Sequence, residues 1–198
     1  MRILLLLAIL FAAPAAALAE PTLDEMRARA LELVNHDRRR RGRKPLVRDA
    51  TLEAASQEHA EDMAERRYFS HKGRDGRRAR KRYLDQGGSS RVSHGENLAS
   101  CRGCPAVDGA RIKRFHRNLM RSRGHRVNIL RRGFTRFGYG LARRQDRNGR
   151  WRIYAVQTFS STPPAAGATA GANAMTLPTR GKVVRKRVRK KRWRLFGR

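Results

Sequence analysis

The sequence predicts one α/β domain in which helices cover both faces of a small antiparallel sheet. Apolar residues recur at three- and four-residue spacing in three separate segments, as they do along one face of an amphipathic helix. Residues 151–159 instead carry apolar side chains on both faces, which is typical of an inner strand that is covered on both sides. A chain of 198 residues, 39% of them hydrophobic, is long enough for one such core.

Two amphipathic helices are predicted in the first third of the chain. Apolar residues at helical spacing between Leu23 and Val34 predict the first, and Gly42 and Pro45 stop it. Asp49 stands where an N-cap belongs, so the second helix is predicted from Ala50 to Arg66. The apolar face of that second helix is formed by Leu52, Ala55, His59 and Met63.

The middle of the chain is more basic and less periodic. Residues 77–86 are predicted as a short helix closed by two glycines, and residues 93–97 are predicted as a loop. Pro105 suits the first turn of a third helix, whose apolar spacing continues toward Ser122-Arg123-Gly124.

Two strands are predicted at the end of the domain. They run from Phe137 to Ala142 and from Trp151 to Phe159, and the dipeptide Asn148-Gly149 lies between them. An Asn-Gly pair between two strand segments is a strong turn signal. These strands are therefore predicted to form an antiparallel hairpin.

The two ends of the chain differ from its middle in composition. Residues 1–19 carry one basic residue, an apolar stretch and Ala17-Leu18-Ala19, the pattern of a cleavable secretory signal peptide. An uncleaved anchor is disfavoured because the apolar run is short and contains Pro14. The expected organisation is a signal peptide at 1–19, a folded domain at 20–160, a Pro/Ala/Gly/Thr-rich linker at 161–179 and a basic, disordered tail at 180–198.

The formal charge of +31 arises from 47 Lys and Arg against 16 Asp and Glu, and it favours polyanionic partners. For an exported protein, periplasmic or secreted, the expected partner is an anionic envelope component, either lipid headgroups or cell-wall phosphates, bound through the basic tail. The tail also contains Trp193 and Phe196, a composition suited to peripheral attachment at a membrane surface. No specific nucleic-acid partner and no transmembrane helix after signal cleavage are expected.

Four local patterns occur in an order that resembles bacterial members of the CAP superfamily (cysteine-rich secretory protein, antigen 5 and pathogenesis-related), also called SCP domains. They are Ala60-Glu61-Asp62-Met63 leading into Tyr68-Phe69-Ser70-His71, Gly95-Glu96-Asn97-Leu98, the run from Ser122 to Leu130, and Phe137-Gly138-Tyr139-Gly140 before Val156-Gln157-Thr158-Phe159. The resemblance implies a three-layer α-β-α sandwich, which agrees with the helices and strands predicted above.

The resemblance also implies a central cleft in which two histidines and acidic residues can hold a divalent metal, commonly zinc. The matching positions are His71, Glu96 and His125. Where many relatives carry a second acid this chain has Ser122, and Leu119 replaces the usual aromatic residue. Neutral imidazoles and a carboxylate are good zinc ligands, and three such ligands plus water form an open site.

Each of these residues also has a structural explanation. His71 can end a loop by bonding to the backbone, Glu96 can hold a turn, and His125 can cap a neighbouring segment. His94 and His116 are further candidates for the cleft, since either can take the place of the missing acid. His59 lies on an apolar helix face, where a core histidine bonded to a backbone carbonyl is expected.

Cys101 and Cys104 form a C-x-x-C pattern in a loop after residue 98. In an exported chain without other cysteines, a local disulfide is the first expectation. A zinc site ranks second because there is no second C-x-x-C pair, and a redox role ranks third because it needs a strand-to-helix context.

The preferred function is that of an exported binding module, envelope-associated or secreted, with a His/Glu cleft that can hold a divalent metal. The alternative is a zinc-dependent hydrolase or protease acting on an extracytoplasmic substrate, with Glu96 as third ligand or general base. No G-x-S-x-G, H-E-x-x-H or P-loop pattern is present, so the sequence assigns no catalytic residue.

Overall fold

The computed structural model describes residues 20–104 and 106–161. The signal peptide predicted at 1–19, the basic tail at 180–198 and all but the first residue of the linker lie outside the described residues. In chain order the described elements are α1 (Leu23–Arg39), β1 (Val47–Arg48), α2 (Ala50–Glu65), α3 (Ala79–Asp85), β2 (His94–Arg102), α4 (Gly109–Arg121), α5 (Arg123–Leu130), β3 (Arg136–Gln145) and β4 (Trp151–Ser160).

The strands form one sheet in the order β1-β3-β4-β2. The predicted hairpin of β3 and β4 is confirmed, and its register pairs Phe137 with Phe159. β2 lies antiparallel on the other side of β4, and the two-residue β1 lies parallel to β3. β4 is therefore an inner strand, as its apolar residues on both faces predicted.

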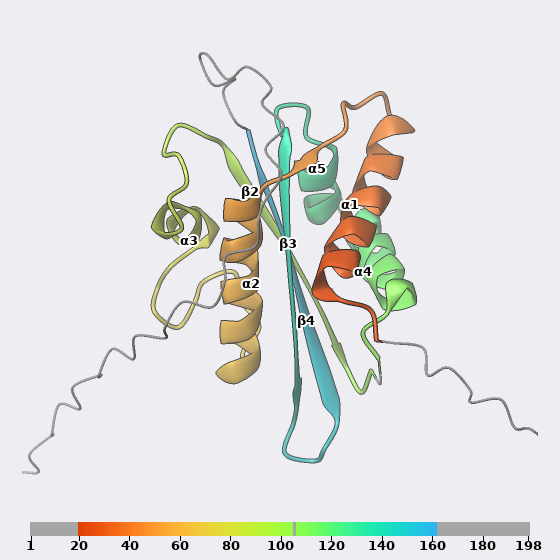
Figure 1. Ribbon diagram of the computed structural model, residues 1–198, viewed down its shortest axis with the longest axis vertical. Coiled ribbons are helices and arrows are strands. Elements are labelled where there is room, and N and C mark those ends of the chain that lie inside the picture. The colour runs from red at the N-terminus through yellow and green to blue at the C-terminus, as the bar shows by residue number, and fades with distance from the viewer. Residues whose placement is uncertain (1–19, 105, 162–198) are drawn as a thin grey trace, which may run out of the picture. The chain divides into compact units, whose positions relative to one another are not determined.

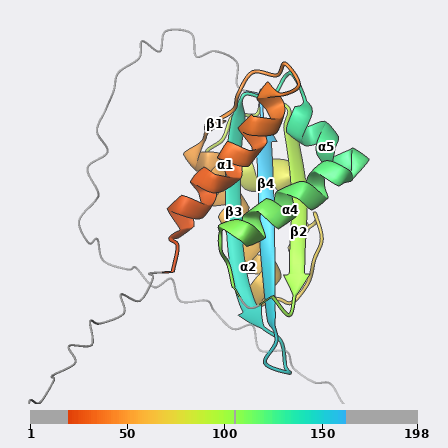
Figure 2. The ribbon, with the colours of Figure 1, turned by 90° about the vertical axis from the view of Figure 1, so that its right-hand side faces the viewer.

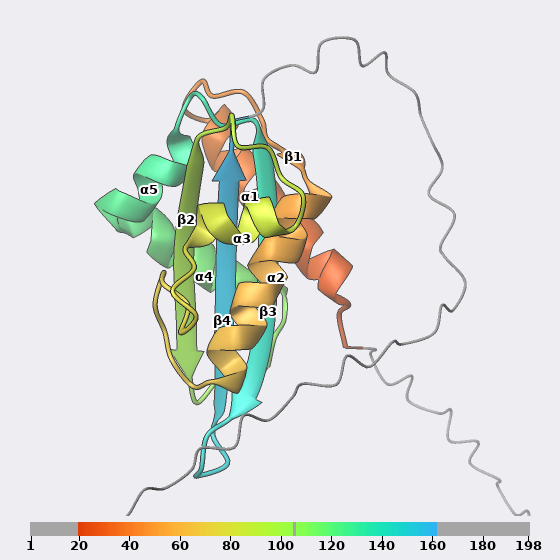
Figure 3. The same ribbon diagram turned by 90° about the vertical axis from the view of Figure 1, so that its left-hand side faces the viewer.

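Helices cover both faces of this sheet (Figure 1). α1, α4 and α5 lie over one face (Figure 2), and α2 and α3 lie over the other (Figure 3). The structure is thus a three-layer α-β-α arrangement, as the resemblance to CAP domains implied. The described helices are all too short or too polar to serve as bilayer-spanning segments.

Side chains fix where three of the helices begin. Thr22 and Glu25 form a reciprocal capping box at α1, and the Asp49 carboxylate accepts from the Leu52 backbone N–H at α2, which confirms the predicted N-cap. Pro105, predicted in the first turn of the third helix, lies outside the described residues. α4 starts at Gly109, where the Asp108 carboxylate accepts from the Arg111 backbone N–H.

The prediction of a loop at residues 93–97 is also wrong, because His94–Arg102 is strand β2 and pairs with β4 along its whole length. An edge strand buries little of its surface, and only two β2 residues, Asn97 and Leu98, are fully buried. Without a buried face the segment lacks the alternation of apolar and polar residues that identifies a strand.

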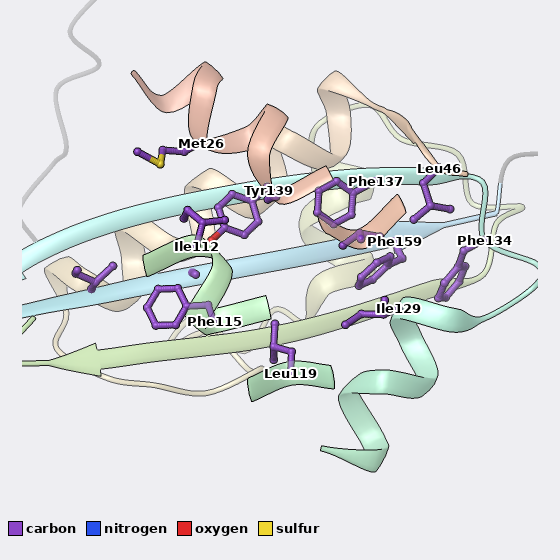
Figure 4. Close-up of a cluster of buried hydrophobic side chains, with 14 of the residues drawn as sticks. Met26, Leu46, Ile112, Phe115, Leu119, Ile129, Phe134, Phe137, Tyr139 and Phe159 are labelled. Carbon is purple, nitrogen blue, oxygen red and sulfur yellow. The ribbon is translucent and has the colours of Figure 1, made fainter. Parts of the chain in front are cut away.

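The larger hydrophobic core lies between the sheet and the helices α1, α4 and α5 (Figure 4). Its buried members include Ile112 and Phe115 of α4, Phe137 of β3 and Phe159 of β4. Phe159 packs against Phe137 and also stacks on Phe134, with ring centroids 5.4 and 5.7 Å apart. The core therefore joins three helices and two strands to the segment that follows α5.

One buried cation, Arg38, holds together the backbone segments around α5. The Arg38 side chain is fully buried, and its guanidinium donates to the backbone carbonyls of Lys44, Ile129, Arg131 and Phe134 at 2.7–3.2 Å. Lys44 precedes β1, whereas the other three carbonyls belong to the last turn of α5 and the segment that follows it. Arg38 thus satisfies backbone groups that would otherwise be buried without partners.

On the opposite face, two glycines of β3 let α2 lie directly on the sheet. A Cβ at Gly138 would collide with the Leu52 backbone, and one at Gly140 would collide with the Ser56 backbone. Both collisions are with main-chain atoms, which cannot move away without displacing α2. This close approach explains why the motif Phe137-Gly138-Tyr139-Gly140 contains alternate glycines.

We expect Gly140→Ala to lower the free energy of unfolding by about 3 kcal/mol, because the added methyl group overpacks the contact between β3 and α2. Urea denaturation of the full chain measures this change. Gly124→Ala is the matched control, since a Cβ at that position meets no atom within 4 Å. In the helical setting of α5 the control leaves stability unchanged or raises it by up to about 1 kcal/mol. Equal effects of the two substitutions would contradict the packing argument.

Candidate functional site

The structure brings His71 and Glu96 into direct contact. His71 lies in the loop between α2 and α3, and Glu96 lies near the start of β2. The His71 Nδ1 atom is 2.8 Å from Glu96 Oε1. A carboxylate can only accept a hydrogen bond, so Nδ1 carries the proton, and Nε2 is the nitrogen that a ligand can reach.

His125 comes to the same place from α5, on the other face of the sheet. Its backbone carbonyl accepts a hydrogen bond from Asn97 Nδ2 at 3.1 Å, which ties α5 to the residue next to Glu96. Burial lowers the pKa of His125, and the nearby His71 ring lowers it further. The His125 imidazole is therefore favoured in its neutral form.

Two asparagines and a glycine hold these segments in register. Asn128 Nδ2 donates to the Glu96 carbonyl at 3.1 Å and to Asn97 Oδ1 at 2.9 Å. A Cβ at Gly95 would lie 2.9 Å from the Phe134 ring and 3.0 Å from Asn128 Oδ1, so a side chain there would press α5 away. These contacts give the Gly95-Glu96-Asn97 motif a structural role beside its carboxylate.

The second oxygen of Glu96 is bound by Arg82, a residue that the sequence analysis did not identify. Arg82 Nη2 lies 2.5 Å from Glu96 Oε2, and only 3% and 6% of the two side chains are exposed. Arg82 Nη1 also donates to the Arg77 carbonyl at 3.0 Å. The Arg82–Glu96 pair is therefore a buried ion pair in which both carboxylate oxygens are occupied, one by Arg82 and one by His71.

His59 supports the loop that carries His71. Its Nε2 lies 2.9 Å from the carbonyl of Ser70, the residue before His71. The side chain is 1% exposed, and burial lowers its pKa, with a further contribution from the charge of Arg82. The interpretation of His59 as a core histidine bonded to a backbone carbonyl is confirmed.

Beside the His71–Glu96 contact is a hollow of about 220 Å³, here called the cleft. It is lined by His71, Arg78, Ala79, Arg80, His94, Gly95 and Glu96. Glu96 is the one acid among these lining residues, and Arg82 already neutralises it. The charge presented to a ligand in the cleft is consequently positive.

The other residues considered for the cleft lie in different surroundings. His94 lines the cleft and packs on Tyr83 with ring centroids 4.5 Å apart, and burial lowers its pKa. His116 instead bonds through Nε2 to Asp37 Oδ2 at 2.8 Å, which joins α4 to α1. Ser122 lies at the junction of α4 and α5, where its side chain makes no capping hydrogen bond.

The arrangement of donors does not fit the implied metal centre. The described residues contain no group of three or more His, Cys, Asp or Glu side chains placed to hold a metal ion. A cation bound by Glu96 would compete with the charge of the Arg82 guanidinium, which together with His71 already bonds both carboxylate oxygens. The zinc site and the zinc-dependent hydrolase thus stay predictions that these contacts do not support.

Cys101 and Cys104 form a disulfide, which confirms the first expectation for this pair. Cys101 belongs to the end of β2, and Gly103 makes the turn between the two cysteines with a φ of 71°. Arg111 of α4 lies against the bridge, with Nη1 3.5 Å from Cys101 Sγ. The bridge thus closes the end of β2 opposite Glu96.

The family model that matches this chain is that of the cysteine-rich secretory protein family, CAP, over residues 31–159. A curated relative, the uncharacterized protein YkwD of Bacillus subtilis, is 30% identical over 118 residues. That alignment covers 57% of this chain and 40% of the relative, so the chain spans less than half of the relative's length.

Two solved structures share the fold. One is an extracellular protein containing an SCP domain from Bacillus anthracis, with a TM-score of 0.57 and 24% identity over 70% of this chain and 41% of that one. The other is an outer surface protein of Borrelia burgdorferi, with a TM-score of 0.56 and 17% identity over 73% of this chain and 98% of that one.

We expect Arg82→Met to lower the free energy of unfolding by about 3–5 kcal/mol, because it leaves the Glu96 carboxylate buried without its cationic partner. Chemical denaturation of the full chain measures the loss. Arg80→Met removes the same charge from a neighbouring exposed arginine and serves as the control, with an expected change below about 1 kcal/mol.

A second variant separates the lost ion pair from the lost packing of a long side chain. In Arg82→Met/Glu96→Gln no buried charge is left unpaired, so the double variant should regain a large part of the stability lost in Arg82→Met. A double variant as unstable as the sum of the two single variants would show that the two residues are not coupled.

Proposed function

Because the chain belongs to the cysteine-rich secretory protein (CAP) family, we propose that it is an extracytoplasmic binding module whose cleft accepts an anionic group of its ligand. The observation that carries this proposal is that the buried Arg82 neutralises the Glu96 carboxylate. The one acid that would favour a bound cation in the cleft therefore contributes no net negative charge. The remaining charged residues of the cleft are arginines.

Arg78 and Arg80 supply the positive charge at the cleft. In residues 20–104 and 106–161 neither forms an ion pair with a carboxylate, and Arg80 bonds to the Ser90 carbonyl. Their neighbour Arg77, in contrast, is paired with Asp75, Glu58 and Asp85. Two unpaired guanidiniums beside a histidine suit a phosphate or carboxylate group of the ligand.

His71 supplies a directional contact in this proposal. Its Nδ1 is held by Glu96, and its side chain is 49% exposed. Because Nδ1 carries the proton, the exposed Nε2 is an acceptor, so beside the two arginines it selects a ligand hydroxyl, such as a protonated phosphate oxygen, at a defined position in the cleft. The arginines attract negative charge over a longer range. These contacts account for binding without any chemical step, so binding is the simplest function that the site supports.

A location outside the cytoplasm is part of the proposal. It is supported by the signal-peptide pattern of residues 1–19 and by the disulfide between Cys101 and Cys104, which persists in oxidising compartments. The two structural relatives are described as extracellular and as an outer surface protein. We propose further that residues 180–198 bind an anionic envelope component, because this segment is rich in Lys and Arg and includes Trp193.

Titration of the full chain with inorganic phosphate, followed by NMR of the histidine Cε1–H signals, tests the cleft. We expect the His71 signal to shift on saturation, and Arg80→Gln to weaken that response about tenfold, because a charge-assisted hydrogen bond is lost. Arg150→Gln is the control, since Arg150 precedes β4 at the end of the strand away from the cleft. Its phosphate affinity at His71 should be unchanged.

Two results would contradict the proposal. One is a His71 signal that does not respond to phosphate, and the other is an equal loss of affinity in the Arg80 and Arg150 variants. Equal losses would mean that phosphate responds only to the total charge of the protein.

A further inference from the structure

A second basic surface lies on α5 and the segments beside it. It is a groove of about 370 Å³, here called the α5 groove, which contains no acidic residue. Its lining consists of Arg43, Arg123, Arg126, Val127, Leu130, Arg131 and Arg132. Arg43 comes from the loop after α1, so the groove joins two segments that are distant in the sequence.

The charges of the α5 groove are uncompensated. Within the part of the chain that the structure describes, none of its five arginines forms an ion pair with a carboxylate. The Nε atom of Arg43 is buried and has no hydrogen-bond partner there. The nearest buried cation, Arg38, contacts only backbone carbonyls, and its pKa is lowered by burial and by the charge of Arg43. Positive charge therefore accumulates here without a protein counterion.

The lining of the α5 groove also includes two apolar side chains, Val127 and Leu130. Val127 is 57% exposed and stands among the arginines, and Leu130 lies one turn further along α5. A phosphate polymer gains nothing from contact with such apolar side chains, whereas a bilayer surface offers both phosphates and acyl chains. Apolar side chains among guanidiniums therefore match the boundary between headgroups and acyl chains of a lipid bilayer.

We propose that the α5 groove docks on the surface of an anionic phospholipid bilayer, with its arginines on the lipid phosphates and Val127 at the headgroup boundary. Arginine binds phosphate through a planar, forked set of donors, and each basic residue near an anionic surface adds to the attraction. The surface is separate from the cleft, although His125 and Arg126 are neighbours on α5. The proposed docking of the α5 groove does not depend on which ligand the cleft binds.

Hydrogen–deuterium exchange of the full chain tests this surface directly, because it reports on α5 whatever the basic tail does. The probe is a vesicle of phosphatidylcholine with about 30% phosphatidylglycerol. We expect residues 123–132 to exchange more slowly with these vesicles than with pure phosphatidylcholine. Arg123→Gln/Arg126→Gln should abolish the protection, and Val127→Ser should reduce it.

The matched control is Arg114→Gln/Arg117→Gln, which removes the same charge from exposed positions of α4. This variant should keep the protection of residues 123–132 and change vesicle affinity by less than about threefold, whereas the α5 pair should lower it about tenfold. Absence of protection at α5 would overturn the proposal. Equal protection by soluble polyphosphate would overturn it too, since the groove would then bind phosphate without requiring a lipid surface.

Discussion

The buried ion pair between Arg82 and Glu96 is the interaction on which the rest of the site depends. Removing two charges from water is costly, and the cost is offset only where both partners are well bonded. Here Glu96 also accepts from His71, and Arg82 also donates to the Arg77 carbonyl. The pair thereby joins α3, the loop before it and the start of β2. The positive charge of the cleft follows from this arrangement, because its acid is already neutralised.

The site is assembled across all three layers, and each layer is fixed by a different physical means. Gly138 and Gly140 allow α2 to lie on the sheet, and from α2 the buried His59 holds the backbone just before His71. On the opposite face, Asn97 and Asn128 bond α5 to β2 and so bring His125 near Glu96. α5 also carries Arg123, Arg126 and Val127 of the α5 groove, so one helix both bonds to the strand that carries Glu96 and forms part of the second proposed binding surface.

Local signals in the sequence were sufficient to predict part of this fold. Asp49 and the apolar face of α2 could be recognised because capping and helical periodicity act within a few residues. β2 could not, since it is an edge strand whose identity comes from pairing with β4. Arg82 was hidden among the many arginines of residues 74–82, and nothing in that run distinguishes the one that is buried. The motif residues His71 and Glu96 could be identified from the sequence. Arg82, the partner of Glu96, could not, because their contact joins segments that only the fold brings together.

A crystal structure of the full chain, grown at neutral pH with Zn²⁺ present, tests the Arg82–Glu96 pair most directly. We expect Arg82 to stay within hydrogen-bond distance of Glu96 and no metal ion to be bound by that carboxylate. A zinc ion coordinated by Glu96 together with His71 and His125, with Arg82 displaced, would contradict this expectation.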